Sequence, residues 1–261
     1  MYMVQKDFAA KASTILQEDN FIIGIAAGGS YITGELDEFS DLDLVIVTKE
    51  SIAGNKHQMV ELAERLGNLL SSFTGEHVGE PRLLICLYDN PLLHVDLKFV
   101  TPEEFKLRVE DPVILLDRAG LLQKIINESK ATFPYPDYQW IEDRFWIWVH
   151  YGLLKIGRGE YIEALDFLSY LRMVVLGPLL HIKNGNLPRG VRKVEMLPAG
   201  DYNNLASTIG SVDKVELISS LENAISLYQE LREVLFKDQI WHQTKTEHAV
   251  LSYLKNLKSN I

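Results

Sequence analysis

Short apolar or alternating stretches punctuate the first half of the chain. An apolar run at 21–27 ends at two glycines, residues 42–47 are apolar apart from Asp43, and residues 93–100 alternate between apolar and polar side chains. Residues 83–88 have a similar character, and 114–116 form a brief apolar run. Because successive side chains of a strand point to opposite faces of a sheet, these stretches predict strands, with the last one at the edge of the sheet.

Elsewhere in the first half, apolar residues recur every three to four positions. This spacing predicts amphipathic helices over 3–17, 56–71 and 119–129. Two prolines then interrupt the chain at 133–136, where neither a helix nor a strand continues easily. We therefore predict that a first domain, built of strands and helices, occupies residues 1–133.

The second half has helical spacing throughout. Apolar stripes run through 141–156, 162–175, 213–236 and 246–258, with a period close to that of an α-helix. A helix can bury such a stripe only against other elements. The pattern therefore predicts a bundle of helices over residues 134–261.

Candidate chemistry begins where the first predicted strand ends. Glycines at 28 and 29 permit a positive φ and let backbone N–H groups approach an anion closely. The hydroxyl of Ser30 adds a further donor. Asp41 and Asp43 follow at the start of the next predicted strand and share one of its faces. The sequence therefore predicts a phosphate cradle beside two carboxylates.

A third carboxylate lies on a matching strand, where alternation places His94 and Asp96 on one face. Neighbouring carboxylates repel each other and raise each other's pKa unless a cation neutralises them. Oxygen ligands suit Mg²⁺, which proteins commonly hold through one or two carboxylates together with substrate phosphates. Asp41, Asp43 and Asp96 are therefore the candidate metal ligands.

Other nucleotide-binding motifs are missing from the sequence. No Gly-Lys-Ser/Thr follows the glycines, which excludes a Walker-type phosphate loop, and no G-x-G-x-x-G indicates a dinucleotide site. A single glycine turn or a single Asp-x-Asp is more often an ordinary turn or a solvated edge. Their combination with a third acidic strand favours a catalytic site.

The combined motif resembles that of the nucleotidyltransferase superfamily, whose pattern is Gly-Gly-Ser, a spacer, Asp-h-Asp with h apolar, and a later Asp. The matching positions are Gly28, Gly29, Ser30, Asp41, Asp43 and Asp96. More narrowly, Gly34 in the spacer, the Phe-Ser-Asp-Leu-Asp run from Phe39 and the helical second half are similar to the antibiotic nucleotidyltransferases that modify aminoglycosides or lincosamides.

This resemblance implies an α+β protein in which an N-terminal mixed β-sheet flanked by helices precedes a C-terminal α-helical bundle that binds substrate or acts as a lid. It also implies Mg²⁺-dependent transfer of a nucleoside monophosphate, with ATP as the favoured donor, to a hydroxyl of a small molecule, and release of pyrophosphate. Asp41 and Asp43 would hold the metal. Relatives use the third acid, here Asp96, either as a metal ligand or as the general base, and both roles stay open.

Further residues are candidates for supporting roles. Lys155 and Arg158 are predicted to bind the nucleotide, because departing pyrophosphate needs cations beyond Mg²⁺. A basic residue at a helix C-terminus also has a dipole reason to be there. Glu76, Glu80 and Glu142 are alternative general bases, although for each of them an ordinary surface acid is the favoured interpretation.

Composition limits the location of the protein. Cys86 is the only cysteine of the 261 residues, which excludes an intrachain disulfide and predicts a core thiol. The N-terminus has no basic, apolar and small-residue progression, and no run of 18 apolar residues occurs. We therefore expect a cytoplasmic protein that does not span a membrane.

Charge limits the partners. A formal net charge of −10 disfavours a polynucleotide acceptor, since phosphate binding normally requires Lys and Arg clusters. An acidic surface would accept a cationic small molecule such as an aminoglycoside, which would give the protein a role in antibiotic resistance. A protein hydroxyl or another metabolite stays open as acceptor, as does a non-catalytic nucleotide-binding regulatory module. The pattern does not choose between a monomer and a homodimer.

Overall fold

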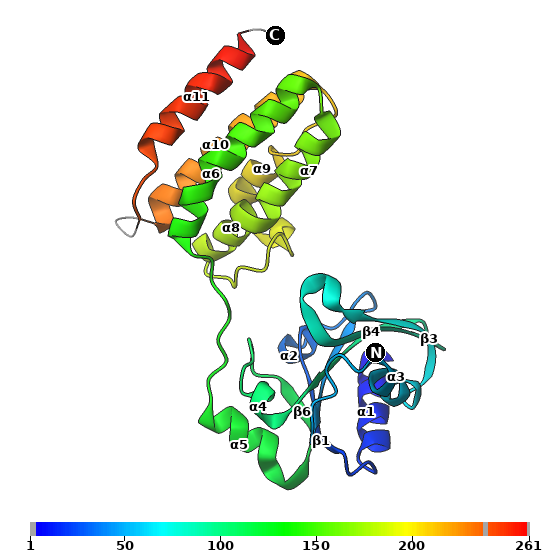
Figure 1. The fold of residues 1–261 in the computed structure, drawn as a ribbon. Coiled ribbons are helices and arrows are strands. Elements are labelled where there is room, and N and C mark those ends of the chain that lie inside the picture. The colour runs from blue at the N-terminus through cyan, green and yellow to red at the C-terminus, as the bar shows by residue number, and fades with distance from the viewer. Residues whose placement is uncertain (1–3, 237–239, 260–261) are drawn as a thin grey trace. The chain divides into compact units, whose positions relative to one another are not determined.

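The computed structural model describes residues 4–236 and 240–259. The chain folds into two compact units, Met1–Phe133 and Pro134–Ile261. The first unit combines a sheet with helices, and the second consists of helices (Figure 1). The expected fold class, a mixed sheet with helices followed by a helical region, is confirmed.

One mixed sheet forms the centre of the first unit, with the strand order β3-β4-β5-β2-β1-β6. Strands β2 and β5 run parallel, and every other neighbouring pair is antiparallel. The predicted edge strand is β6, which pairs with β1 alone. The strands span β1 (Ile22–Ala27), β2 (Leu42–Thr48), β3 (Asn68–Gly75), β4 (Glu80–Asp89), β5 (Leu93–Val100) and β6 (Val113–Asp117).

Helices cover the two faces of this sheet unequally. One face packs against α1 (Val4–Leu16) and α3 (Lys56–Glu64), where a core cluster includes side chains of β1, β2, β4 and β5. The other face carries α4 (Pro102–Phe105) and α5 (Leu121–Glu128), which pack over a smaller cluster on β1, β2 and the end of β5 (Figure 1). Cys86 is a core residue of β4, and burial raises the pKa of its thiol to about 12.

The sequence pattern was wrong about the end of the second predicted helix. The helix expected over 56–71 stops at Glu64, and Asn68–Gly75 form β3 instead. The chain turns at Gly67, where a Cβ atom would lie 3.2 Å from the ring of Tyr88. Pairing with β4 then leaves Leu70 52% exposed, so cross-strand pairing overrides the helical spacing of its apolar residues.

The other predicted helices of this unit agree with the structure to within about two residues. The helix expected over 3–17 is α1, although residue 3 lies outside the described residues. The helix expected over 119–129 begins at Leu121, after the short 3₁₀ turn η2 (Arg118–Gly120). A short helix α2 (Ser30–Thr33) follows the glycine turn, and η1 (Glu76–Val78) joins β3 to β4.

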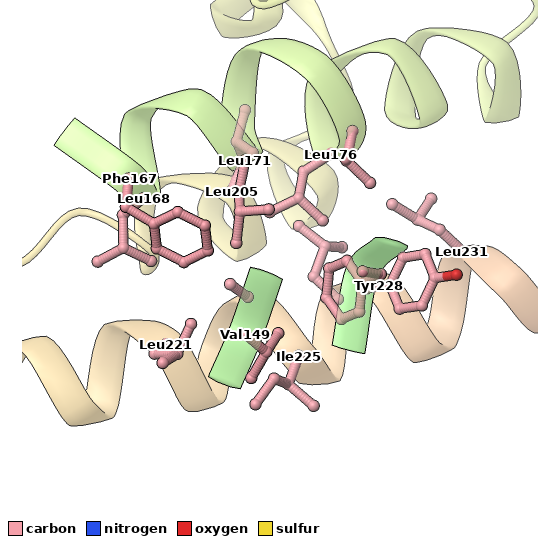
Figure 2. Close-up of a cluster of buried hydrophobic side chains, with 14 of the residues drawn as sticks. Val149, Phe167, Leu168, Leu171, Leu176, Leu205, Leu221, Ile225, Tyr228 and Leu231 are labelled. Carbon is pink, nitrogen blue, oxygen red and sulfur yellow. The ribbon is translucent and has the colours of Figure 1, made fainter. Parts of the chain in front are cut away.

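The second unit is built around a core shared by its long helices. Val149, Phe167, Leu221 and Tyr228 meet there from three different helices (Figure 2). The elements are α6 (Tyr138–Arg158), α7 (Tyr161–Leu171), η3 (Arg172–Leu176), α8 (Gly177–Lys183), η4 (Val194–Met196), α9 (Ala199–Ala206), α10 (Lys214–Leu235) and α11 (Thr244–Lys258).

A π-helical turn interrupts the second long helix of this unit. Over Arg172–Leu176, immediately before Gly177 and Pro178, the backbone hydrogen bonds follow the π-helical rather than the α-helical pattern. Among the described residues, Tyr161–Lys183 is the one stretch long and apolar enough to cross a membrane, and 56% of its most apolar window is buried. Val175, Leu176 and Leu179 of this stretch lie in the bundle core.

Candidate active site

Two of the predicted carboxylates are neighbours across adjacent strands. Asp43 of β2 pairs in register with Asp96 of β5, and side chains at paired positions of parallel strands lie on the same face. Both side chains are partly exposed, whereas Leu42 and Leu44, which flank Asp43, and Leu97, which follows Asp96, are buried. Asp41 lies just before β2 and is exposed. The sheet therefore brings Asp43 and Asp96 together, with Asp41 at their margin.

The glycine turn lies directly against Asp43. Gly28 N donates a hydrogen bond of 3.0 Å to the backbone oxygen of Asp43. Gly29 has φ 58° and ψ −136°, and a Cβ atom there would overlap Oδ2 of Asp43. Only glycine combines that dihedral with that close approach. The turn therefore lies directly against Asp43, one member of the carboxylate pair.

An acidic residue outside every sequence motif also contacts the turn. Gly29 N donates a hydrogen bond of 3.0 Å to Oε1 of Glu110. Glu110 lies in the loop between α4 and β6, 81 positions from Gly29. No local pattern singles it out, so only the tertiary structure could identify this contact.

A buried glutamine fixes the spacer between the turn and Asp41. Nε2 of Gln5 donates to the backbone oxygens of Asp37 and Ser40, at 2.9 and 2.7 Å. Gln5 is 4% exposed and shares the buried stripe of α1 with Ala9, Ala12 and Leu16. A polar residue at a stripe position is a signal that could have identified it. Its amide holds the loop that leads into β2.

Two polar contacts involve the strand that carries Asp96, and one of them is made by Asp96 itself. His94 Nε2 lies 3.0 Å from Oδ1 of Asp96. Further along β5, Lys98 pairs with Glu80 at 2.9 Å. A hydrogen bond from Arg82, followed by the one from Lys98, lowers the pKa of Glu80 to about 2. A carboxylate held so acidic is a poor general base at neutral pH.

An apolar strip continues the face that carries the two carboxylates. Asp96 pairs with Ile85 of β4, and Ile85 pairs with Phe73 of β3. The row across the sheet is therefore Phe73, Ile85, Asp96 and Asp43. Ile85 is partly exposed and Phe73 is 52% exposed. The carboxylates thus adjoin an apolar surface that belongs to the first unit.

The two predicted phosphate-binding cations lie in the second unit and are paired with acids there. Lys155 Nζ lies 2.9 Å from both Glu160 and Glu163, and Arg158 lies 2.8 Å from Glu160. Hydrogen bonds from Lys155 to these two carboxylates raise its pKa. The assignment of Lys155 and Arg158 to nucleotide binding stays a prediction.

Glu142 is fully buried rather than a surface acid. It accepts hydrogen bonds from Tyr228 Oη, from Arg232 and from the backbone N of Gln243. These partners come from α10 and from the segment before α11, while Glu142 belongs to α6. The Glu142 carboxylate therefore links three segments of the helical bundle to one another. Glu76, the third alternative base, is hydrogen-bonded by Thr74 in the β3–β4 connection.

The residues present fit a divalent cation through two protein carboxylates. Within residues 4–236 and 240–259, no three Asp, Glu, His or Cys side chains gather closely enough to hold a metal ion by themselves. The expected three-carboxylate cluster is therefore not formed there. Two carboxylates in register, Asp43 and Asp96, match the number with which proteins commonly hold a divalent cation when substrate phosphates complete its coordination.

A family profile described as "Nucleotidyltransferase domain" matches residues 9–144, more than half of the chain. The chain belongs to the nucleotidyltransferase family. The matched region contains the whole glycine turn, the spacer and all three aspartates. Nucleotidyltransferases generally use a nucleoside triphosphate and a divalent metal ion, in agreement with the donor set of Asp43 and Asp96.

Two solved structures are similar to this nucleotidyltransferase at low identity. An aminoglycoside 6-adenyltransferase from Bacillus subtilis has 14% identity and a TM-score of 0.40, with 99% of both chains covered. A nucleotidyltransferase-like protein from Exiguobacterium sibiricum has 15% identity and a TM-score of 0.37, with 97% of this chain and 88% of that chain covered. Values this low say nothing of the substrate of this chain. No curated protein matches the sequence.

Proposed function

We propose that this nucleotidyltransferase moves a nucleoside monophosphate, AMP from ATP, to a hydroxyl group of a small molecule and releases pyrophosphate. An aminoglycoside-like antibiotic is the leading acceptor. The observation that carries the proposal is the register pair of Asp43 and Asp96 with the glycine turn seated on Asp43. Phosphate donors and metal-binding carboxylates therefore adjoin each other on one sheet face.

The residues of the turn would bind and orient the triphosphate. Gly28 N is already bonded to the backbone oxygen of Asp43, so the donors of the turn for phosphate oxygens are the N–H group of Gly29 and the hydroxyl of Ser30. Asp43 would hold Mg²⁺ with those oxygens, and Asp96 would act either as a second ligand or as the general base. In a two-metal arrangement, one ion would lower the pKa of the acceptor hydroxyl and the other would stabilise the leaving oxygen. Asp41 would add a further carboxylate at the exposed margin.

The direction of attack follows from the position of the turn. In an in-line displacement, the attacking oxygen and the leaving oxygen lie on opposite sides of the reacting phosphorus. If the turn holds the leaving phosphates beside β1 and β2, the acceptor hydroxyl approaches from the side of β5 and β4. Asp96 lies on that side, where it could accept the hydroxyl proton, and the contact with His94 would orient it.

The direct test is pyrophosphate release with Mg²⁺, a panel of nucleoside triphosphates, and panels of aminoglycosides, lincosamides and candidate proteins. We expect release with a small-molecule acceptor, and loss of that release in Asp43→Ala. Glu103→Ala is the matched control, because Glu103 is an exposed acid of the same unit that forms an ion pair with Lys106. Release with a protein acceptor alone would change the substrate class. No release with any acceptor would contradict transferase activity.

A further inference from the structure

A carboxylate of the protein itself, that of Glu110, is hydrogen-bonded to the glycine turn. Gly29 N donates to Oε1 of Glu110 at 3.0 Å, and the same oxygen lies 3.7 Å from the position that a Cβ atom on Gly28 would occupy. A carboxylate oxygen therefore rests over both glycines. Asp43 lies against Gly29 as well, with its Oδ2 where a Cβ atom on Gly29 would be. The turn thus contacts two carboxylates.

The fold builds this contact through anchors on both sides of Glu110. Two residues before it, the side chain of Arg108 is 7% exposed and donates to Ser129 Oγ and to the backbone oxygen of Ser129 at 2.6 and 2.8 Å. Three residues after it, Val113 begins β6 and pairs with Ala27, the residue immediately before Gly28. The register of β6 against β1 therefore sets Glu110 beside the turn.

A phosphate oxygen at the turn would need the donor that Glu110 uses. One N–H group makes one good hydrogen bond, so a carboxylate and a phosphate oxygen on Gly29 N exclude each other. Their like charges add a further cost when both are close. We propose that Glu110 occupies the position of a triphosphate oxygen on the glycine turn, and that a nucleotide must displace it in order to bind.

This inference rests on the proposed function, because it assumes that the turn receives phosphate. Displacement would take place by rotation of the Glu110 side chain, since Arg108 and Val113 anchor the backbone on either side. Side-chain rotation is fast and needs no opening of the loop. Glu110 would therefore hold Gly29 in its left-handed conformation until a nucleotide binds, and would set the affinity for the incoming triphosphate.

The test measures binding to the full chain by calorimetry, with Mg²⁺-ATP, with inorganic tripolyphosphate and with adenosine. Glu110→Gln keeps an oxygen acceptor without the charge, and Glu110→Ala removes the competitor. We expect Kd for ATP and for tripolyphosphate to fall by about tenfold in Glu110→Ala, the scale of one charged hydrogen bond, and by less in Glu110→Gln. Adenosine, which lacks phosphate, should show no change. Glu103→Gln should bind like the wild type.

The outcomes separate this inference from the proposed function. If the wild type binds ATP or tripolyphosphate and both Glu110 variants bind equally or more weakly, Glu110 is not a competitor and the inference is overturned. If no variant binds either phosphate compound, the phosphate site itself fails and the inference fails with it. Should Glu110→Ala lose its fold by circular dichroism, the nearly isosteric Glu110→Gln decides between the same results.

Discussion

Gly29 is the residue on which the glycine turn depends, for two separate reasons. Its φ of 58° lies in the left-handed region, which costs a residue with a Cβ atom about 1–2 kcal/mol. A Cβ atom would also overlap Oδ2 of Asp43. The first reason concerns stability alone, whereas the second concerns the carboxylate that we expect to bind metal. Two glycine substitutions can tell them apart.

Gly29→Ala should lose activity out of proportion to its loss of stability. The added methyl group must push Asp43 away from its position, and a displacement of about 1 Å at a reacting centre can cost about a hundredfold in rate. The measurement is kcat/KM for pyrophosphate release together with the thermal midpoint Tm.

Gly79→Ala is the control for backbone strain. Gly79 has φ 74°, and a Cβ atom added there would meet no atom within 4 Å apart from its own chain neighbours. The variant should lose about 1 kcal/mol of stability and keep its activity. Equal activity losses in the two variants would show that strain, rather than contact with Asp43, matters at Gly29.

At this scale the sequence predicted the residues that belong to a local pattern. Alternation along two strands was enough to put Asp43 and Asp96 on comparable faces, and the parallel pairing of β2 with β5 makes them neighbours. Gln5 and Glu110 could not be found in the same way. They reach the site across 32 and 81 positions of sequence, and only the packing of α1 and the register of β6 bring them there.

Among the elements, β4 and β5 are joined beside the site by a charged cluster. Glu80 lies between Arg82 of its own strand, at 2.6 Å, and Lys98 of β5, at 2.9 Å. Arg82 also approaches Glu104 of α4 at 3.6 Å. The cluster therefore connects two strands and a helix of the first unit.

This cluster predicts a defined pH dependence of stability. The Arg82 and Lys98 contacts lower the pKa of Glu80 from 4.5 to about 2 in the folded chain. The stabilisation is therefore complete above about pH 4.5 and is lost as pH falls towards 2. We expect the difference in Tm between the wild type and Glu80→Gln to shrink over that interval. A difference independent of pH would mean that the charge of Glu80 does not stabilise the fold.

The long helices of the second unit share a buried polar group of their own. Glu142 is 0% exposed, and Arg232 lies 3.2 Å from it and 2.9 Å from Glu247. Burial, followed by the contact with Glu142, raises the pKa of the Tyr228 hydroxyl. α6, α10 and α11 therefore meet around one carboxylate.

Glu142→Gln should destabilise the protein and leave catalysis intact. Arg232 keeps its ion pair with Glu247, so the cost is that of a buried hydrogen-bonding group that loses one partner, about 1–3 kcal/mol. The measurement combines urea denaturation with kcat for pyrophosphate release. A large fall in kcat at unchanged stability would instead make Glu142 the general base.

Element types followed from periodicity more reliably than element ends. Period two identified strands at 42–47 and 93–100, and the helical stripes of the second half became helices. The error at 56–71 arose because apolar residues of a helix and of an edge strand can have the same spacing over a few positions. Only the partner strand β4, which no local signal announces, decides in favour of β3.

At the scale of the whole molecule, the motifs of the sequence were enough to identify the family. They do not identify the acceptor. The profile match over residues 9–144 establishes a nucleotidyltransferase. The assignment of catalysis to residues 1–133, of a substrate-binding or lid role to residues 134–261, and of nucleotide binding to Lys155 and Arg158 stays a prediction. Acceptor choice depends on the shape of a surface rather than on a motif.

The measurement that tests the central claim most directly is the fate of labelled phosphate. ATP labelled either at the α- or at the γ-phosphate is incubated with Mg²⁺ and the acceptor that supports turnover, and the products are separated. The account predicts that α-label moves to the acceptor while γ-label leaves in pyrophosphate. Transfer of γ-label to the acceptor, or its release as inorganic phosphate, would contradict nucleotidyl transfer at Asp43 and Asp96.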